Sequence, residues 1–230
     1  MASKKYLIVS AGGSGTRMGG PLPKQFMDIG GEAILHRTIS LFVSAVPDIN
    51  VITVLPQEHI KWWQNYCQVH PYPQPQRIVK GGFTRFHSVQ NALGQVPDGA
   101  IVAVHDAVRP LISTGLIKRL FSEMESHRAV IPVTPAIDTL KLLDRENGEL
   151  KEADECLDRS RVWCAQTPQM FRSEDLKAAY TQAYDTVFTD DASVASRYGI
   201  PLTFVEGERL NLKITTPEDL VLAKAILNLS

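Results

Sequence analysis

Residues 7–26 read LIVSAGGSGTRMGGPLPKQF, and this stretch decides which kind of fold the chain can adopt. Its apolar start is typical of a buried strand, and it breaks directly into a run of glycines. Glycine lets backbone N–H groups approach an anion closely, and arginine offers several donors to phosphate oxygens. The stretch therefore predicts an anion-binding turn after a strand, with Arg17 and Lys24 as its cations.

Two familiar phosphate-binding loops do not match this turn. The dinucleotide-binding fingerprint would require glycine at position 18, where the chain has Met18, and the P-loop would require a Gly-Lys-Ser/Thr sequence. The turn still shares the physical basis of those loops, because Gly12, Gly13 and Gly15 leave backbone N–H groups accessible to an anion beside the two cations. A plain strand–helix turn with surface cations is the alternative interpretation.

Outside this loop, short apolar runs alternate with amphipathic segments. Helices are expected at 32–45, 58–67, 88–96, 114–126, 173–185 and 216–229. Strands are expected at 6–10, 51–55, 77–82, 100–110, 129–133 and 202–207, with further apolar runs at 162–171 and 210–214. This alternation predicts an α/β fold: a Rossmann-like, mostly parallel sheet with helices on both faces. Ligands of such sheets bind beyond the carboxyl ends of the strands.

One stretch, residues 136–161, interrupts the alternation. It contains two β-like segments around Asn147-Gly148, a dipeptide typical of hairpin turns, and residues 138–155 carry seven acidic and three basic side chains. We expect one domain over residues 1–230 with a protruding β-hairpin arm at 136–161. A solvated surface excursion is one interpretation of the arm. A dimer arm is the other, because a lone two-stranded hairpin is only marginally stable in water.

Composition narrows the class of protein. The 230 residues are 44% hydrophobic and 21% charged, and 24 basic against 25 acidic side chains leave a net charge of −1. This balance predicts no nucleic-acid partner and no membrane surface, so local cations must meet any anionic ligand. No apolar stretch approaches the roughly 20 residues that span a bilayer. Three widely spaced cysteines indicate neither a disulfide framework nor a zinc site, and we expect a cytoplasmic protein.

Seven motifs resemble those of nucleotidyltransferases that act on sugar phosphates and polyol phosphates. The first is AGGSGTRMG with PKQF. The others follow in the order seen in 2-C-methyl-D-erythritol 4-phosphate cytidylyltransferases: GGFTRFHSV (81–89), HDAVRP (105–110), DT (138–139), DRSRVWCAQTPQMF (158–171), TDDAS (189–193) and LNLKITTPEDL (210–220). The resemblance to this family covers almost the whole chain.

The resemblance implies an enzyme that joins CMP from CTP to methylerythritol phosphate, a polyol phosphate acceptor, and releases pyrophosphate with Mg²⁺ as cofactor. It also implies a homodimer in which the arm crosses to the second subunit. The cations implied to act in catalysis are Arg17, Lys24, Arg159 and Lys213. The residues implied to bind the substrates are Ala11, Gly12, Gly13, Gly15, Gly82, Arg85, Ser88, Asp106, Arg109, Thr139 and Thr167. The ligands of the metal are left open.

One position departs from the family's pattern. Phe83 stands where the family commonly has an acidic residue. Either this position contacts the base only through its backbone, or the missing carboxylate changes base selectivity. Two other functions fit many of the same motifs: a ribitol-5-phosphate cytidylyltransferase, and a non-catalytic module that binds nucleotides.

Three polar positions also have structural interpretations. Asp106 is either a hydroxyl acceptor or water-mediated metal ligand, or a structural partner of Arg109. His105 alternates to the other side of the strand, and we expect it to be structural. Thr189, Asp190 and Asp191 are typical of a helix cap. A phosphate monoester is already anionic near neutral pH, so the implied reaction needs no general base.

Overall fold

The centre of the molecule is an eight-stranded sheet. The computed structural model describes residues 3–13, 22–72, 75–153 and 157–229. The strand order is β7-β11-β6-β1-β4-β5. β10 also pairs with β7, along the same edge as β11, and β12 pairs with the opposite edge of β7. The strands are β1 (Lys5–Ser10), β4 (Asn50–Leu55), β5 (Gln76–Lys80), β6 (Ile101–Asp106), β7 (Ala129–Pro135), β10 (Trp163–Ala165), β11 (Gln169–Arg172) and β12 (Thr203–Glu206).

Parallel pairing dominates this sheet. β1 pairs in parallel with both β4 and β6, β4 with β5, and β12 with β7. In the described part of the chain, β10 and β11 are the antiparallel members. The order leaves β1 at a switch point, with β4 on one side and β6 on the other, and ligand sites of open α/β sheets lie at such points. The mostly parallel α/β fold is confirmed.

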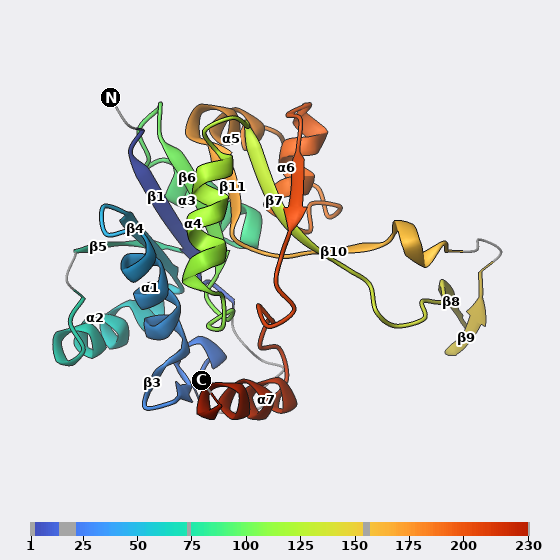
Figure 1. Cartoon of the computed structure of the whole chain (residues 1–230), viewed down its shortest axis with the longest axis horizontal. Coiled ribbons are helices and arrows are strands. Elements are labelled where there is room, and N and C mark those ends of the chain that lie inside the picture. Colours follow the sequence, from blue (N-terminus) through green and yellow to red (C-terminus); the bar gives the residue numbers. More distant parts are fainter. Residues whose placement is uncertain (1–2, 14–21, 73–74, 154–156, 230) are drawn as a thin grey trace.

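Helices cover both faces of the sheet (Figure 1). On β1, the side chains of Leu7 and Val9 join one apolar cluster, and Ile8 between them joins the other, as a strand with two buried faces requires. The first cluster is covered by α1 (Ile34–Ala45), α2 (Ile60–Val69) and α4 (Thr114–Glu123). The second is covered by α3 (Arg85–Leu93), α5 (Ser173–Ala179) and α6 (Asp191–Tyr198). A small third cluster packs α7 (Pro217–Asn228) beneath the start of α1.

Several element boundaries differ from those expected. The helix expected from residue 32 begins at Ile34, because β2 (Asp28–Ile29) and β3 (Glu32–Ala33) form a short hairpin first. Its turn is Gly30-Gly31, and both glycines have positive φ, 68° and 89°. The helix expected over 173–185 ends at Ala179, and residues 210–214 form no strand.

The apolar run at 162–171 is two strands rather than one. Ala165 on β10 pairs with Val133, and Met170 on β11 pairs with Val130. The segment from Ala165 to Met170 therefore advances five residues while its partner β7 advances three, from Val133 to Val130. The extra residues between β10 and β11 form a bulge. Thr167 lies in this bulge, beside the end of β6.

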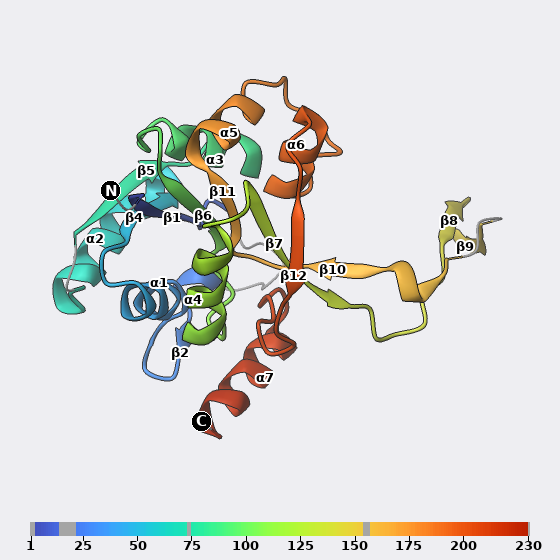
Figure 2. The ribbon, with the colours of Figure 1, turned by 45° about the horizontal axis from the view of Figure 1, so that its top comes forward.

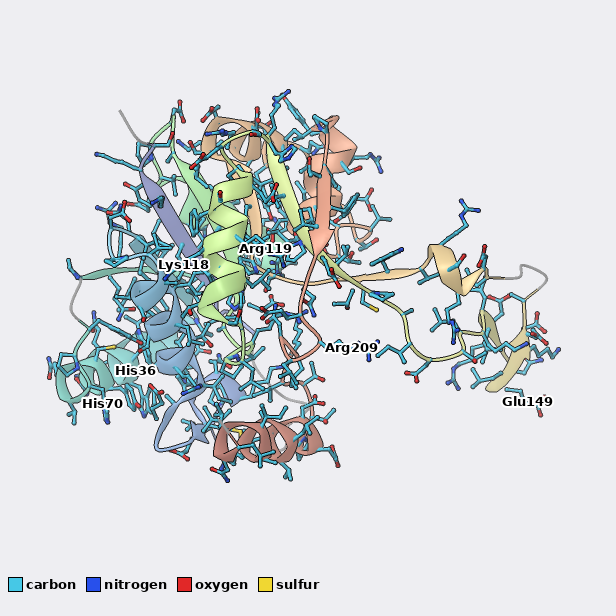
Figure 3. The ribbon with its side chains drawn as sticks, in the orientation of Figure 1. His36, His70, Lys118, Arg119, Glu149 and Arg209 are labelled. Carbon is cyan, nitrogen blue, oxygen red and sulfur yellow. The ribbon has the colours of Figure 1, made fainter. Side chains whose placement is uncertain are left out.

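The arm leaves the domain at one end of β7 and returns through β10 (Figure 2). Its hairpin joins β8 (Leu143–Glu146) to β9 (Glu149–Glu152), and Glu149 lies at the far end in Figure 3. Asn147 and Gly148 have φ of 50° and 89°, which confirms the expected turn. Every residue of both strands is exposed.

The described helices and cysteines bear on two further expectations from the sequence. Among the described helices, none combines the length and the apolar character that a bilayer crossing demands. Cys67 and Cys164 are both free thiols, and Cys156 lies outside the described residues.

Candidate active site

A cavity of about 510 Å³ opens where β1 and β6 end. Its lining brings together residues from both ends of the chain. The described lining residues are Ser10, Ala11, Gly12, Gly13, Lys24, Gln25, Gly82, Phe83, Thr84, Arg85, Ser88, Asp106, Ala107, Val108 and Lys213. Three of these side chains are cations and one is a carboxylate, so the described lining favours an anionic ligand.

The glycine turn forms one wall of this cavity. The buried side chain of Gln25 holds it, because its amide nitrogen donates to the carbonyl oxygens of Ala11 at 2.9 Å and Gly13 at 3.1 Å. Sequence reasoning missed this role, although Gln25 stands in the PKQF motif. Gly15 and Arg17 lie outside the described residues.

The start of α3 forms the facing wall. The backbone N–H of Gly82 donates to Ser88 Oγ at 3.1 Å, and a Cβ on Gly12 would lie 3.1 Å from the same oxygen. A Cβ on Gly82 would lie 2.4 Å from His87 Cβ, closer than two such carbons can approach. Gly82 therefore leaves no room for a side chain beside the start of α3, and Gly12 packs closely against Ser88. Phe83, between them and solvent, is fully exposed at the rim of the cavity.

Lys24 lies in a short 3₁₀ turn, Lys24–Phe26, that follows the glycine loop. Its Nζ donates to the carbonyl oxygen of Ile214 at 3.0 Å. This bond fixes the loop that carries Lys213 against the side of the cavity where the glycine turn lies. Lys24 and Lys213 therefore line the same cavity from two distant parts of the sequence.

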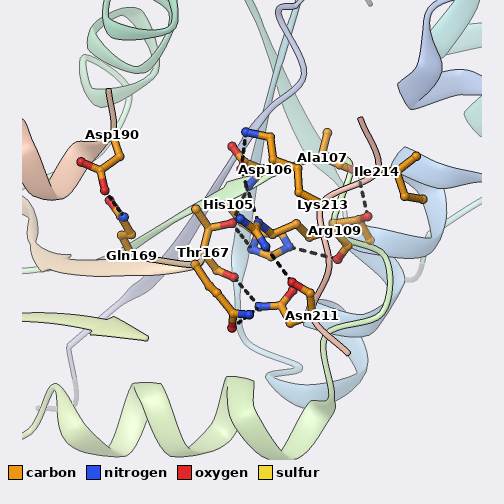
Figure 4. Close-up of polar contacts among 12 residues, drawn as sticks. His105, Asp106, Ala107, Arg109, Thr167, Gln169, Asp190, Asn211, Lys213 and Ile214 are labelled. Carbon is orange, nitrogen blue, oxygen red and sulfur yellow. Dashed lines mark hydrogen bonds and ion pairs between the residues drawn. The ribbon is translucent and has the colours of Figure 1, made fainter. Parts of the chain in front are cut away.

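Asp106 is surrounded by cations, as Figure 4 shows in part. Its carboxylate oxygens lie 3.0 Å from Lys213 Nζ, 3.5 Å from Arg109 Nε and 3.7 Å from Arg85 Nε. Burial alone would raise the pKa of Asp106, but Arg85, Lys213 and Arg109 outweigh it and hold that pKa well below its usual range. Asp106 is therefore ionised at neutral pH, and its charge orders three cations.

A polar network supports Asp106 from behind. The backbone N–H of Asp106 donates to Thr167 Oγ1 at 3.1 Å. Arg109 Nη1 donates to the carbonyl oxygen of Asn211 at 2.7 Å, and Asn211 Nδ2 donates to the Thr167 carbonyl at 2.9 Å. Thr167 and Arg109 thus contact Asp106 without being among the described lining residues. Asn211 was missed, because only the folded chain brings it beside Thr167.

His105 belongs to this network and not to the cavity. It is fully buried, and its ring packs against the ring of Phe42, with 4.8 Å between the two ring centroids. Thr167 Oγ1 donates to Nδ1 at 3.0 Å, and Nε2 donates to the Arg109 carbonyl at 3.3 Å. Burial lowers the pKa of His105 to about 3. A neutral imidazole satisfies both bonds, so the structural interpretation of His105 fits.

The two arm residues expected at the site, Thr139 and Arg159, do not lie at the cavity of their own chain. Thr139 and Arg159 are exposed, and neither is among the described residues lining the cavity. Arg159 Nη1 donates to the carbonyl oxygen of Ile137 at 3.0 Å, which closes the base of the arm. Their expected role at a partner's site stays a prediction.

The fit of a divalent metal depends on the carboxylates available. Among the described residues, no three His, Cys, Asp or Glu side chains cluster as metal ligands. Asp106 is the one carboxylate in the described lining, and cations already surround it. Magnesium is commonly held by one or two carboxylates together with substrate phosphates, and this cavity suits that mode only if phosphate oxygens supply most ligands.

Comparisons with known proteins agree with one another. The family model for 2-C-methyl-D-erythritol 4-phosphate cytidylyltransferase matches residues 6–229. An enzyme of that name from Bacteroides thetaiotaomicron is 41% identical, with 97% of this chain and all of the relative aligned, and one from Porphyromonas gingivalis is 42% identical, with 99% of each aligned. The crystal structure of 4-diphosphocytidyl-2C-methyl-D-erythritol synthase from Anaerococcus prevotii matches with a TM-score of 0.80 and 28% identity, covering 98% of this chain and 99% of that one.

Proposed function

The chain belongs to the 2-C-methyl-D-erythritol 4-phosphate cytidylyltransferase family, and from this premise we propose how its cavity carries out that reaction. The chain transfers CMP from CTP to 2-C-methyl-D-erythritol 4-phosphate, which yields 4-diphosphocytidyl-2-C-methyl-D-erythritol and pyrophosphate. The observation that carries the proposal is the cavity itself. It joins a bare glycine backbone to Lys24, Arg85 and Lys213 at the carboxyl ends of β1 and β6.

The chemistry requires charge control and no proton acceptor. An oxygen of the acceptor phosphate attacks the α-phosphorus of CTP, and the bond from that phosphorus to the bridging oxygen breaks as pyrophosphate leaves. The attacking phosphate is already an anion near neutral pH. Two polyanions must therefore be brought together, and fixed cations are what stabilise the charge that develops.

The described cations divide between two ends of the cavity. Lys24, beside the glycine turn, faces the triphosphate. Arg17, the other cation that the family resemblance implies for catalysis, lies outside the described residues. Lys213, held by Asp106, faces the acceptor phosphate, and Arg109 contacts Asp106 from outside the described lining. Gly82 and Ser88 form the wall against which the nucleoside lies.

Magnesium completes this proposal. Bound to the triphosphate, it would neutralise phosphate charge and orient the reacting group. Asp106 is the described residue placed to contact it, directly or through water, because it is the carboxylate of the lining. The larger share of its ligands would come from phosphate oxygens.

The arm belongs to the proposal as a dimer contact. Ile137, Leu143, Leu150 and Trp163 are exposed apolar side chains on or beside it. A two-stranded hairpin without a packed face is marginal in water, so a second copy of the chain would supply the missing cover. We place Thr139 and Arg159 at the partner's acceptor site.

We also treat residues 1–230 as one nucleotidyltransferase domain. We place the protein in the cytoplasm because the number and spacing of its three cysteines favour no disulfide framework.

Pyrophosphate release from CTP tests the function directly. The purified chain is incubated with CTP, Mg²⁺ and either methylerythritol phosphate or ribitol 5-phosphate. We expect release with methylerythritol phosphate and at most slow release with ribitol 5-phosphate. Turnover with ribitol phosphate alone would reassign the acceptor, and CTP binding without turnover on either acceptor would favour a binding module.

A further inference from the structure

A buried carboxylate outside the cavity holds Arg85, the first residue of α3. Arg85 Nη2 lies 2.6 Å from Asp191 Oδ2, and its Nε lies 3.7 Å from Asp106 Oδ1. Asp191 is fully buried and is not among the described lining residues. One guanidinium therefore joins a carboxylate of the cavity lining to a buried carboxylate outside the described lining.

Asp191 is itself fixed on its other side. The hydroxyl of Tyr180 donates to Asp191 Oδ1 at 2.6 Å. Tyr180 is buried, and its ring stacks on Phe86 at 4.6 Å between centroids, on the residue that follows Arg85. Both oxygens of this carboxylate have a close donor. A buried carboxylate satisfied in this way has one stable orientation.

The backbone beneath Asp191 is anchored to the sheet. Asp190 caps α6 in a capping box, and Asp191 is the first residue of that helix. Gln169 on β11 bridges to this helix end: its Nε2 donates to Asp190 Oδ2 at 2.7 Å, as Figure 4 shows, and its Oε1 accepts from the Ala192 N–H at 2.8 Å. Gln169 pairs in register with Val104 on β6, the strand that ends in Asp106. The same sheet therefore places Asp106 and Asp191.

We propose that Asp191 is a positioning residue for nucleotidyl transfer: it holds the Arg85 guanidinium at the cavity wall and keeps it from closing on Asp106. The proposal rests on the proposed function of the cavity. Interactions that assist phosphoryl transfer must be in place before the charge develops, and a long arginine side chain needs a partner to stay in one position. Asp191 is that partner.

Removing the charge of Asp191 has a definite physical consequence. Asp106 is then the carboxylate that remains beside Arg85, and planar guanidinium groups pair with carboxylates through two parallel hydrogen bonds. A closed Arg85–Asp106 pair competes with Lys213, which lies 3.0 Å from the same carboxylate. The charge arrangement at the acceptor end changes although no lining residue has been replaced.

The variant Asp191→Asn tests this proposal, and Asp98→Asn is its matched control. The chemical change is identical and Asp98 is also ion-paired, but its partner is Lys177, at 2.7 Å, and its side chain is exposed. An exposed ion pair contributes little, so Asp98→Asn should change kcat/KM by less than about threefold. Asp191→Asn should lower kcat/KM by roughly 10- to 100-fold, as for other residues that orient a functional group.

A double-mutant cycle separates positioning from a general structural role. If Asp191 acts through Arg85, Asp191→Asn should lower kcat/KM further by less than about threefold in an Arg85→Ala background. A structural role would leave the full loss in that background. Tyr180→Phe removes only the second donor to Asp191 and is a milder change. If Asp191→Asn does not fold, Tyr180→Phe takes its place in the same double-mutant cycle with Arg85→Ala.

The outcomes are distinguishable. A wild-type chain without turnover overturns the proposed function. With an active wild type, a loss from Asp191→Asn or Tyr180→Phe that disappears in the Arg85→Ala background supports the positioning role. A loss that persists there, or equal activities for Asp191→Asn and Asp98→Asn, overturns it.

Discussion

Lys24 Nζ donates to the carbonyl oxygen of Ile214 at 3.0 Å, across 190 positions of sequence. This contact joins the loop after the first strand to the loop before the last helix. It places Lys24 and Lys213 on the same cavity, where one faces the glycine turn and the other faces Asp106. Several consequences of this arrangement can be measured.

Replacement of Lys24 by alanine should lower kcat by on the order of a hundredfold, the loss typical of one preorganised donor to a developing negative charge. KM for CTP should change less, if the charge acts mainly in the transition state. Steady-state kinetics with both substrates give the two numbers. The exposed Lys224→Ala is the control, and near-full turnover of Lys24→Ala would remove Lys24 from the mechanism.

Replacement of Gly82 by alanine should abolish CTP binding while the protein stays folded. The new Cβ would lie 2.4 Å from His87 Cβ and 2.9 Å from the His87 carbonyl carbon, so the wall of the cavity must move. Calorimetric titration with CTP measures the effect. Gly115→Ala, the same change inside α4, should bind CTP normally and be slightly more stable. Normal CTP binding by Gly82→Ala would show that the wall is not used.

Acid should destabilise the protein through His105. Its unfolded pKa is about 6.5 and its folded pKa is about 3, so between these values the unfolded state binds the extra proton. Its stabilising contribution is complete above pH 6.5 and is lost as the pH falls towards 3. We expect a loss of roughly 2–3 kcal/mol in the free energy of unfolding between pH 6.5 and 4.5 from this residue.

Urea unfolding across this pH range, compared with His105→Gln, measures that loss. The variant should show a flatter dependence of unfolding free energy on pH, whatever its absolute stability. His127→Gln, at a partly exposed position, should keep the wild-type slope. Equal slopes for His105→Gln and the wild type would contradict a neutral buried His105.

Mixing two inactive variants should restore activity if the arm completes the partner's site. A mixed dimer of Lys24→Ala and Arg159→Ala has one doubly damaged site and one intact site. Random reassociation of equal amounts should therefore give roughly a quarter of wild-type activity. No recovery, with mixed dimers shown to form by differently tagged subunits, would place Arg159 in the same chain's site or outside the site altogether.

Much of the fold could be predicted because local pattern and tertiary structure agree. Leu7, Ile8 and Val9 indicate a strand buried on both faces, and both faces are covered. Asn147-Gly148 predicted a hairpin turn, and both residues have positive φ. The Gly30-Gly31 turn carried the same kind of signal, but the following helical pattern concealed it.

The rest of the site depends on contacts that no local pattern contains. The carbonyls that Gln25 holds, the position of Asn211 behind Asp106, and the pairing of Arg85 with Asp191 all join distant segments. Asp191 was expected as part of a helix cap, and Asp190 is the residue that caps. The direction in which Asp191 points is set by Tyr180 and Arg85, which only the folded chain brings together.

The central claim, transfer of the α-phosphoryl group of CTP to the acceptor phosphate, is tested most directly by isotopic labelling. The chain is given methylerythritol phosphate, Mg²⁺ and CTP labelled at either the α- or the γ-phosphate. The account predicts that the α label appears in the cytidyl product and the γ label in pyrophosphate. Transfer of the γ label to the acceptor, or an α label that remains in CTP or appears in free CMP while the acceptor is consumed, would contradict it.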